Sequence, residues 1–363
     1  MPVVSRHSNA SPGGAIVSTG VAVRAAVCFA LVAQLAACVR PPSSFTCSSS
    51  PQCSGGGTCQ PVGLCSFADP SCATGQRYGA ASGELGGVCV GDELGTGGPA
   101  VGCDLAKPFG SPVLVPGIAS SVEDASMRLS PDEKTAYFFS ARSGAKLLYT
   151  ASRASRSAAF GNVAALANVN SGDQYNPTIS ADGLNLFFAS FRAGGVGDND
   201  IYQATRSSIT ASFGSPRLAP NVNTAASEVQ PYVTHDGTTL YFVRTVATGE
   251  KVFRAAGSVT IGFANPVMVP EIAGPTNDAD PVLANDGLTL YWGSDRPGGQ
   301  GDVDVWQARR ASTSVPFGEL APVATVNTAG FDAPNDLSED GCRLYLTSIR
   351  GGRTGIYIAT RPP

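Results

Sequence analysis

The sequence predicts an all-β protein, a five-bladed β-propeller with four-stranded blades that follows a small disulfide-rich segment. Three observations predict it. A unit of 50 to 54 residues recurs five times, each copy has the pattern of several short strands joined by turns, and no long stretch after the N-terminus has the spacing of an amphipathic helix. With 43 glycines, 26 prolines and 14% charged residues in 363, the composition suits many turns. A fixed period of this length with several strands per copy is typical of a propeller.

An aspartate marks the same place in every copy, and an aromatic residue follows it by five positions. The aspartates are Asp132, Asp182, Asp236, Asp286 and Asp340, and the aromatic residues are Tyr137, Phe187, Tyr241, Tyr291 and Tyr345. Glycine follows four of the aspartates, which is a tight-turn signal between strands. The first copy has Glu133 instead of that glycine. Four copies have Ser-x-Arg after the second strand, whereas the third has Arg244 and Val246 there.

A second marker, Phe-Gly or Phe-Ala, precedes a short strand in each copy. It occurs at Phe109, Phe160, Phe213, Phe263 and Phe317. The first marker lies before the first aspartate unit, and the last unit has no strand after its third. The strand after Phe109 is therefore predicted to complete the last blade, so that residues 109–363 form a closed ring without exposed edges.

The N-terminal region has the pattern of an export signal. Residues 1–37 contain Arg6 and Arg24, no acid, and an apolar run of thirteen residues from 25 to 37, which is too short to span a bilayer. The sequence Leu-Ala-Ala-Cys ending at Cys38 resembles the lipobox of bacterial lipoproteins. That resemblance implies cleavage before Cys38 and its acylation, with residues 38–46 as a tether. Valine at position 39 implies, by the same resemblance, the outer membrane. The alternative is an ordinary signal peptide with an incidental cysteine.

Six cysteines in a segment poor in apolar residues indicate disulfides. They are Cys47, Cys53, Cys59, Cys65, Cys72 and Cys89, within residues 47–89. Such a segment buries too little apolar area to fold without cross-links, and six cysteines allow fifteen pairings. A metal site is the alternative, but the spacing is mostly C-x5-C and no histidine is near. Residues 90–108 are predicted to form a linker.

Cys103 and Cys342 are left over, and we predict that they pair and lock the ring. Cys103 lies just before the closing strand, and Cys342 begins the second strand of the last blade. Only the third strand separates these two strands, a gap of about 10 Å.

Residues 180–206 and 284–310 resemble the WD-like repeats of the TolB-type propeller group, which is found in bacterial envelope proteins. The resemblance covers residues 109–363. It implies the propeller fold and an envelope location, but no particular activity. TolB itself has six blades and a separate N-terminal domain, which this chain lacks, so a role in the Tol system is not implied.

Composition excludes several functions. His7 and His235 are the two histidines, so Ser-His-Asp and Cys-His catalysis are not expected. After residues 1–37 are removed, 22 Lys and Arg face 28 Asp and Glu, which gives no basic groove for nucleic acid. Asp198-Asn199-Asp200 and Asp302-Val303-Asp304 follow glycine-rich turns; they suit either calcium or turn capping. We favour capping and predict no metal or cofactor.

The loop before each inner strand has an acid or amide in register. These residues are Asp124, Gln174, Glu228, Asp278 and Asp332, and two positions further are Ser126, Asn176, Gln230, Asp280 and Pro334. At one mouth of the channel, such a ring of carboxylates suits a cation, a sugar or a basic peptide. The alternative is that each side chain caps a turn. Repetition in every copy favours the structural role, since a ligand site usually breaks symmetry.

Two functions remain. The first is a non-enzymatic lipoprotein of the cell envelope whose propeller binds a protein or glycan or acts as a scaffold. The second is a glycosidase that uses two or three channel carboxylates, drawn from Asp124, Glu228, Asp278, Asp280 and Asp332. Because an acid pair needs distinct environments to separate its pKa values and these acids look alike, we predict a binding protein rather than an enzyme.

Overall fold

The computed structural model describes residues 103–363 without a gap and, before them, residues 47, 49–53, 55–60, 64–70, 75–79 and 90. Cys38, the predicted export signal and the predicted tether lie outside the described residues. Among the described residues, no helix has the length and apolarity needed to cross a bilayer.

The part from 103 onward consists of five antiparallel four-stranded sheets, one per repeat. Blade 1 contains β5(Asp124–Leu129), β6(Thr135–Ser140), β7(Leu147–Ser152) and β8(Gly161–Ala165). Blade 2 contains β9(Gln174–Ile179), β10(Asn185–Ser190), β11(Asp200–Thr205) and β12(Arg217–Leu218). Blade 3 contains β13(Glu228–Val233), β14(Thr239–Val246), β15(Gly249–Ser258) and β16(Gly262–Met268). Blade 4 contains β17(Asp278–Leu283), β18(Thr289–Ser294), β19(Asp304–Arg309) and β20(Gly318–Pro322).

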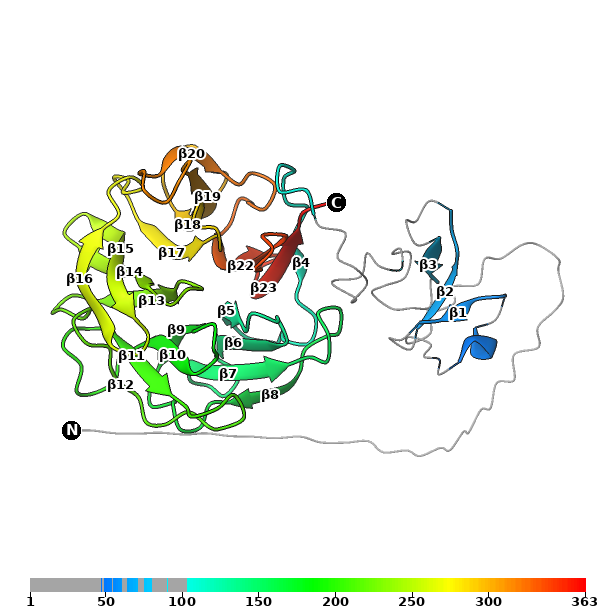
Figure 1. Cartoon of the computed structure of the whole chain (residues 1–363), viewed down its shortest axis with the longest axis horizontal. Coiled ribbons are helices and arrows are strands. Elements are labelled where there is room, and N and C mark those ends of the chain that lie inside the picture. The colour runs from blue at the N-terminus through cyan, green and yellow to red at the C-terminus, as the bar shows by residue number, and fades with distance from the viewer. Residues whose placement is uncertain are drawn as a thin grey trace, which may run out of the picture. The chain divides into compact units, whose positions relative to one another are not determined.

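Blade 5 shows how the ring closes. It contains β21(Asp332–Leu337), β22(Arg343–Arg350), β23(Arg353–Thr360) and, as its outer strand, β4(Val113–Leu114) from the start of the propeller. Leu114 pairs with Tyr357 across this junction. The inner strand of each blade contacts the inner strand of the next, and β21 contacts β5 (Figure 1). The predicted five-bladed propeller, closed by an N-terminal strand, is confirmed.

The predicted disulfide between Cys103 and Cys342 is present and joins residues 239 positions apart. Close to it, the backbone N–H of Asp104 donates to the carbonyl of Pro362 at 3.0 Å. Residues 103–108, which we expected to be the end of a linker, are therefore bonded to the last blade.

A β-bulge interrupts every inner strand where it pairs with the second strand. In blades 1 to 4 it places one non-glycine residue at positive φ, between 47° and 53°: Ser126, Asn176, Gln230 and Asp280. In blade 5 the equivalent residue is Pro334, whose ring fixes φ near −65°. The bulge there falls between Pro334 and Asp336 instead, so the proline explains the local departure from symmetry.

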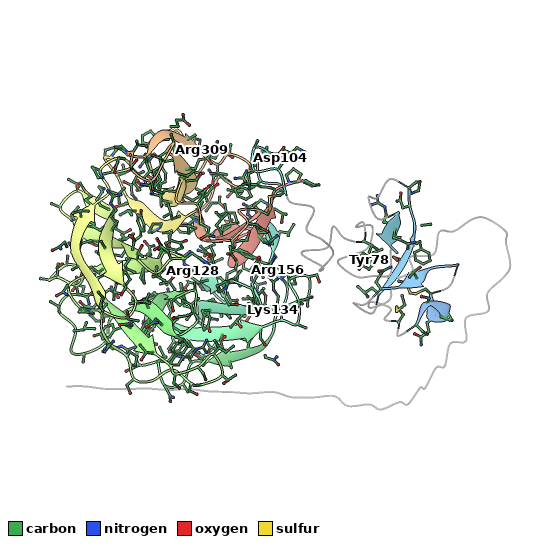
Figure 2. The ribbon with its side chains drawn as sticks, in the orientation of Figure 1. Tyr78, Asp104, Arg128, Lys134, Arg156 and Arg309 are labelled. Carbon is green, nitrogen blue, oxygen red and sulfur yellow. A yellow bond between two sulfur atoms is a disulfide. The ribbon has the colours of Figure 1, made fainter. Side chains whose placement is uncertain are left out.

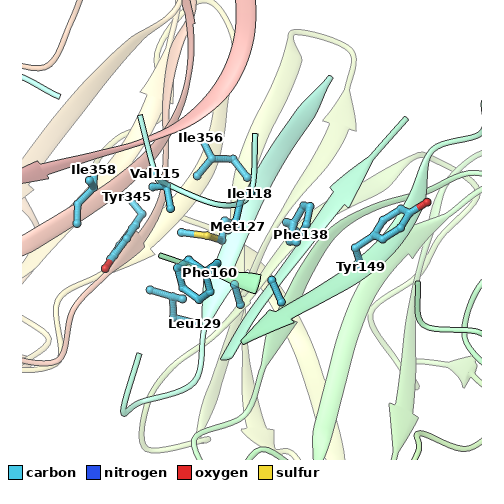
Figure 3. Close-up of a cluster of buried hydrophobic side chains, with 12 residues drawn as sticks. Val115, Ile118, Met127, Leu129, Phe138, Tyr149, Phe160, Tyr345, Ile356 and Ile358 are labelled. Carbon is cyan, nitrogen blue, oxygen red and sulfur yellow. The ribbon is translucent and has the colours of Figure 1, made fainter. Parts of the chain in front are cut away.

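The hydrophobic core lies between neighbouring blades. Figure 3 shows the cluster at the junction of blades 5 and 1, where Met127 and Phe138 from blade 1 pack with Tyr345 and Ile356 from blade 5. The closing junction is therefore packed like the others as well as being hydrogen-bonded and cross-linked.

The cysteine-rich segment forms a small unit of η1(Ser50–Gln52), β1(Thr58–Cys59), β2(Cys65–Ala68) and β3(Gln76–Tyr78). Disulfides join Cys47 to Cys59 and Cys53 to Cys65. Cys72 and Cys89 lie outside the described residues. The sulfurs of Cys47, Cys53 and Cys59 lie within 4.8 Å of one another, but each is in a disulfide, so they are not free to bind a metal.

Candidate functional site in the channel and between blades 1 and 2

The predicted ring of acids and amides lies where each inner strand begins. Its side chains are buried, with exposures of 0 to 1%, and each belongs to a different blade: Asp124, Gln174, Glu228, Asp278 and Asp332. Burial of five such groups demands internal partners, and in the described residues each group has them except for the Oε1 atom of Gln174.

Asp332 illustrates these partners. Its carboxylate accepts from the backbone N–H and hydroxyl of Thr328 at 2.6 and 2.7 Å and from the Ser348 hydroxyl at 2.5 Å. Arg350 lies 3.2 Å away and stacks on Tyr357. Asp124 and Asp278 likewise accept from a preceding backbone N–H and from the arginine of Ser-x-Arg. This is the geometry of the capping alternative.

The two exceptions keep the same architecture. Gln174 donates from its amide nitrogen to the carbonyls of Ser171 and Gly172. In blade 3, Arg244 occupies the serine position of the motif, opposite Glu228. Its guanidinium donates to Glu228 at 2.7 Å and to the Val222 carbonyl at 2.7 Å. The missing Ser-x-Arg is thus replaced by an arginine two positions earlier and a longer acid.

The acids after the glycine-rich turns also act as caps. Asp200 accepts from the N–H of Val196 at 2.8 Å, and Asp304 accepts from the N–H of Gln300 at 2.7 Å. Gly197 shows why glycine is needed in this loop: a Cβ there would lie 2.0 Å from the Ala226 carbonyl oxygen in the next blade. The geometry is that of capping, which we favoured over calcium.

The five blades differ from one another at the position four residues after the start of each inner strand. The residues there are Arg128, Thr178, Tyr232, Val282 and Asp336, one from each blade. Figure 2 shows Arg128 near the middle of the ring of blades. Its guanidinium carbon lies 4.9 Å from the centre of the Tyr232 ring, and its Nη2 donates to the Pro281 carbonyl at 3.4 Å. A cation, an aromatic ring and an acid thus lie close together here, and the sequence analysis named none of these three residues as a candidate.

Burial shifts the pKa values of Arg128 and of the titratable groups around it. It raises the pKa of Asp280 to about 7 and that of Asp336 to about 6, because an apolar environment disfavours the charged form. The same burial lowers the pKa of Arg128 and raises that of Tyr232. Arg128 and Asp336 line a cavity of about 70 Å³ at the channel mouth. His235 and Glu339 lie at its rim, 3.7 Å apart, and are substantially exposed.

A cleft of about 720 Å³ lies between blades 1 and 2. Its lining mixes polar groups, such as Thr150, Asn168 and Arg206, with apolar ones, such as Ala165 and Phe213. Ala165 pairs with Tyr149, and the residues at the same register in the other blades are larger: Leu114, Leu218, Met268 and Pro322. The small side chain of Ala165 therefore contributes to the space that distinguishes this cleft.

A second recurring arginine, which the sequence analysis missed, connects blades. Arg206 of blade 2 stacks on Phe213 and donates to the hydroxyl of Tyr137 in blade 1 at 3.0 Å. Arg153 and Arg361 reach the previous blade's Tyr345 and Tyr291 in the same way.

The junction between blades 2 and 3 differs on both sides. The arginine position in blade 3 is Gly257, and the facing aromatic residue in blade 2 is Phe187, which has no hydroxyl. Phe187 packs against Phe263 instead, with ring centres 5.8 Å apart. Where the donor is lost, its acceptor is lost too.

Comparisons with known proteins support the fold. No family model matches the chain, and no curated protein matches it. Similar solved structures include the catalytic domain of the GH62 α-L-arabinofuranosidase from Coprinopsis cinerea, at 14% identity and a TM-score of 0.50, over 70% of this chain and 97% of that one. They also include TolB from Acinetobacter baumannii, at 16% identity and a TM-score of 0.46, over 67% of this chain.

The alignment with TolB spans 56% of the TolB chain, a little over half. The endo-arabinase from Bacteroides thetaiotaomicron is similar at 13% identity and a TM-score of 0.47, over 68% of this chain and 97% of that one. At such identities the likeness concerns the fold alone. This chain is an all-β propeller, and the catalytic domain of the GH62 α-L-arabinofuranosidase is similar to it in fold.

Proposed function

We propose that this chain is a non-enzymatic binding protein of the cell envelope, whose cleft between blades 1 and 2 takes a protein or glycan ligand. The cleft itself is the main support. Its volume of about 720 Å³ falls in the range of roughly 300–1,000 Å³ that is usual for ligand sites. Its lining combines hydrogen-bonding groups with apolar surface, as recognition of a peptide or a sugar requires.

The positions of the acids argue against the glycosidase alternative. Glycoside hydrolysis needs one protonated and one ionised carboxyl group on either side of the scissile bond. Asp124, Glu228, Asp278 and Asp332 are buried and hydrogen-bonded as caps. Asp280 and Asp336 have raised pKa values, but the cavity that Asp336 lines measures about 70 Å³, about a tenth of the cleft between blades 1 and 2, and so leaves little room for a sugar.

We expect Ala165→Leu to weaken ligand binding at least about tenfold, because a misplaced methylene in a fitted pocket has effects of that size. The fold should persist, since leucine occupies the same register in blades 2 and 5. Binding is measured with the purified full chain on an array of envelope glycans and by capture from envelope extract. Ala164→Leu, an exposed neighbour outside the cleft lining, is the control and should bind like the wild type.

Equal binding by Ala165→Leu and the wild type would place the ligand elsewhere. Release of sugar from arabinan or aryl-glycosides by the wild type would instead favour the hydrolase. These two results are distinct, because the first concerns the site and the second the class of protein.

We further propose anchoring through an acylated Cys38, which the Leu-Ala-Ala-Cys sequence supports. The disulfides between residues 47 and 59, 53 and 65, and 103 and 342 suit an oxidising compartment outside the cytoplasm. In cells fed a labelled fatty acid, the wild type should acquire label and Cys38→Ser should acquire none. Equal labelling of the two proteins would show that Cys38 is not the acylated residue.

A further inference from the structure

Arg128 is a buried cation without a direct counter-ion. It is 6% exposed, and its Nη1 atom has no hydrogen-bond partner in the described part of the chain. Its Nη2 bond to the Pro281 carbonyl is long, at 3.4 Å. A buried guanidinium with unused donors is costly, so this site is incomplete as the protein alone presents it.

The nearby acids do not complete it. The two carboxylate oxygens of Asp336 accept from the backbone N–H groups of Leu129 at 2.7 Å and Leu337 at 3.0 Å. Between Arg128 and the carboxylates of the described residues, no ion pair forms within 4.0 Å. The acids act on Arg128 only through longer-range attraction.

The space beside Arg128 limits what can bind. The cavity that Arg128 lines measures about 70 Å³, which is room for a few waters or for a ligand of a few heavy atoms. We infer that the channel binds a small free carboxylate, of the size of formate or acetate, which accepts hydrogen bonds from the Arg128 guanidinium. This site is separate from the cleft between blades 1 and 2 and does not depend on the function proposed for that cleft.

The charges around the channel should make this binding depend on pH. The titratable groups that face Arg128 are Tyr232 from β13, Asp280 from β17 and Asp336 from β21, while β9 contributes the neutral Thr178. His235, Glu339 and Glu133 also line the cavity, and Glu133 is paired with arginine. Glu250 is not in the lining but acts on Asp280 through its charge. When ionised, Asp280 and Asp336 repel an incoming carboxylate.

Whether binding strengthens or weakens with pH follows from the raised pKa values of Asp280, about 7, and Asp336, about 6. Below these values both groups are neutral and leave Arg128 as the dominant charge, so a carboxylate binds better. Above them both are negative and binding weakens. Burial raises the pKa of Tyr232, so its hydroxyl stays neutral throughout.

The test is a titration of the purified full chain with ¹³C-formate, followed by NMR at constant ionic strength in a bulky sulfonate buffer. We expect saturable binding that is about fivefold or more tighter at pH 5 than at pH 8, a typical coupling between sites. Arg128→Met should abolish it. Arg353→Met, which removes an exposed arginine, should leave it unchanged.

Asp280→Asn tests the same site by an expected gain of formate binding rather than a loss. If Arg128→Met does not fold, this variant is sufficient to test the inference. Asparagine suits this backbone, because Asn176 holds the equivalent place at a φ of 51°, against 47° for Asp280. The variant should bind formate about fivefold or more tighter than the wild type at pH 8. Three results would overturn the inference. The wild type could show no saturable formate binding at any pH, a folded Arg128→Met could bind formate as well as the wild type, or Asp280→Asn could bind it no tighter than the wild type.

Discussion

Replacing Glu133 with glutamine is expected to lower the free energy of unfolding by about 3–5 kcal/mol, the usual cost of breaking a buried ion pair from one side. Glu133 takes the place of the turn glycine in blade 1 and has a φ of 58°. Its carboxylate, 3% exposed, accepts two bonds from Arg343 at 2.7 and 3.0 Å and one from the Tyr345 hydroxyl at 2.7 Å. Arg153 lies 3.6 Å away.

Arg343 and Tyr345 belong to blade 5, so this cluster connects the first blade to the last. Glutamine keeps the size of the side chain but removes the negative charge beside Arg153, which is buried, and beside Arg343, which keeps Asp340 at 2.9 Å. Chemical denaturation followed by circular dichroism measures the change. Glu123→Gln is the matched control, because Glu123 and its partner Lys146 are each more than a third exposed and such pairs contribute about 0–1 kcal/mol.

Glu133→Gly separates the cluster from the turn. Glycine restores the residue found in the other four copies and removes the strain of a side chain at positive φ, worth roughly 1–2 kcal/mol. We expect this variant to remain less stable than the wild type, because Arg153 and Arg343 again lose the Glu133 carboxylate. Stability equal to that of the wild type would show that the ion-pair cluster contributes no more than the roughly 1–2 kcal/mol of strain that glycine relieves.

Removing the Cys103–Cys342 disulfide by a double substitution to alanine is expected to lower the free energy of unfolding by about 2–5 kcal/mol. The bond closes a loop across 239 positions, which restricts the unfolded chain. In the folded state it holds the start of the propeller beside a closing strand of only two residues, Val113–Leu114, both exposed. Without it, that strand is held by its pairing with β23 and by the burial of the flanking Phe109 and Val115.

Denaturant unfolding of the double variant beside the wild type measures this effect, and peptide mapping without reductant should recover Cys103 joined to Cys342. Substitution of both Cys47 and Cys59 is the control: it removes a disulfide of the cysteine-rich segment and should leave the unfolding midpoint of the propeller unchanged. An unchanged midpoint in the Cys103 and Cys342 variant would mean that β4 stays in place without the cross-link.

The features that repeat were predictable from the sequence. The aspartate and Phe-Gly markers fixed the number of blades, and the marker at Phe109 before the first aspartate unit predicted the closing strand. The disulfide at Cys342 followed because two cysteines remained and strand geometry brings them together. The reason for Glu133 in place of glycine could not be predicted, since its partners Arg343 and Tyr345 lie more than 200 positions away.

The candidate sites were harder to predict because they depend on what does not repeat. Asp124 and its counterparts were conspicuous in the sequence because every blade has an acid or amide there, and the acids among them accept backbone N–H bonds. Arg128 lies two positions after Ser126, the last residue considered in that strand, and comparing the position of Arg128 across the blades would have revealed it. Ala165 requires the register of the outer strands, which β12 and β4, with two residues each, barely mark in the sequence.

The matched losses at Phe187 and Gly257 bear on how the ring assembles. A chain of five similar units can misfold by docking a blade on the wrong neighbour. A third blade placed beside the first would leave the Tyr137 hydroxyl without its guanidinium, and a fourth or fifth blade placed beside Phe187 of the second would bury an arginine against a ring with no oxygen to receive it. Each error leaves a polar group unsatisfied. The matched arginine and aromatic residues at the junctions therefore favour the correct order of blades while the chain folds.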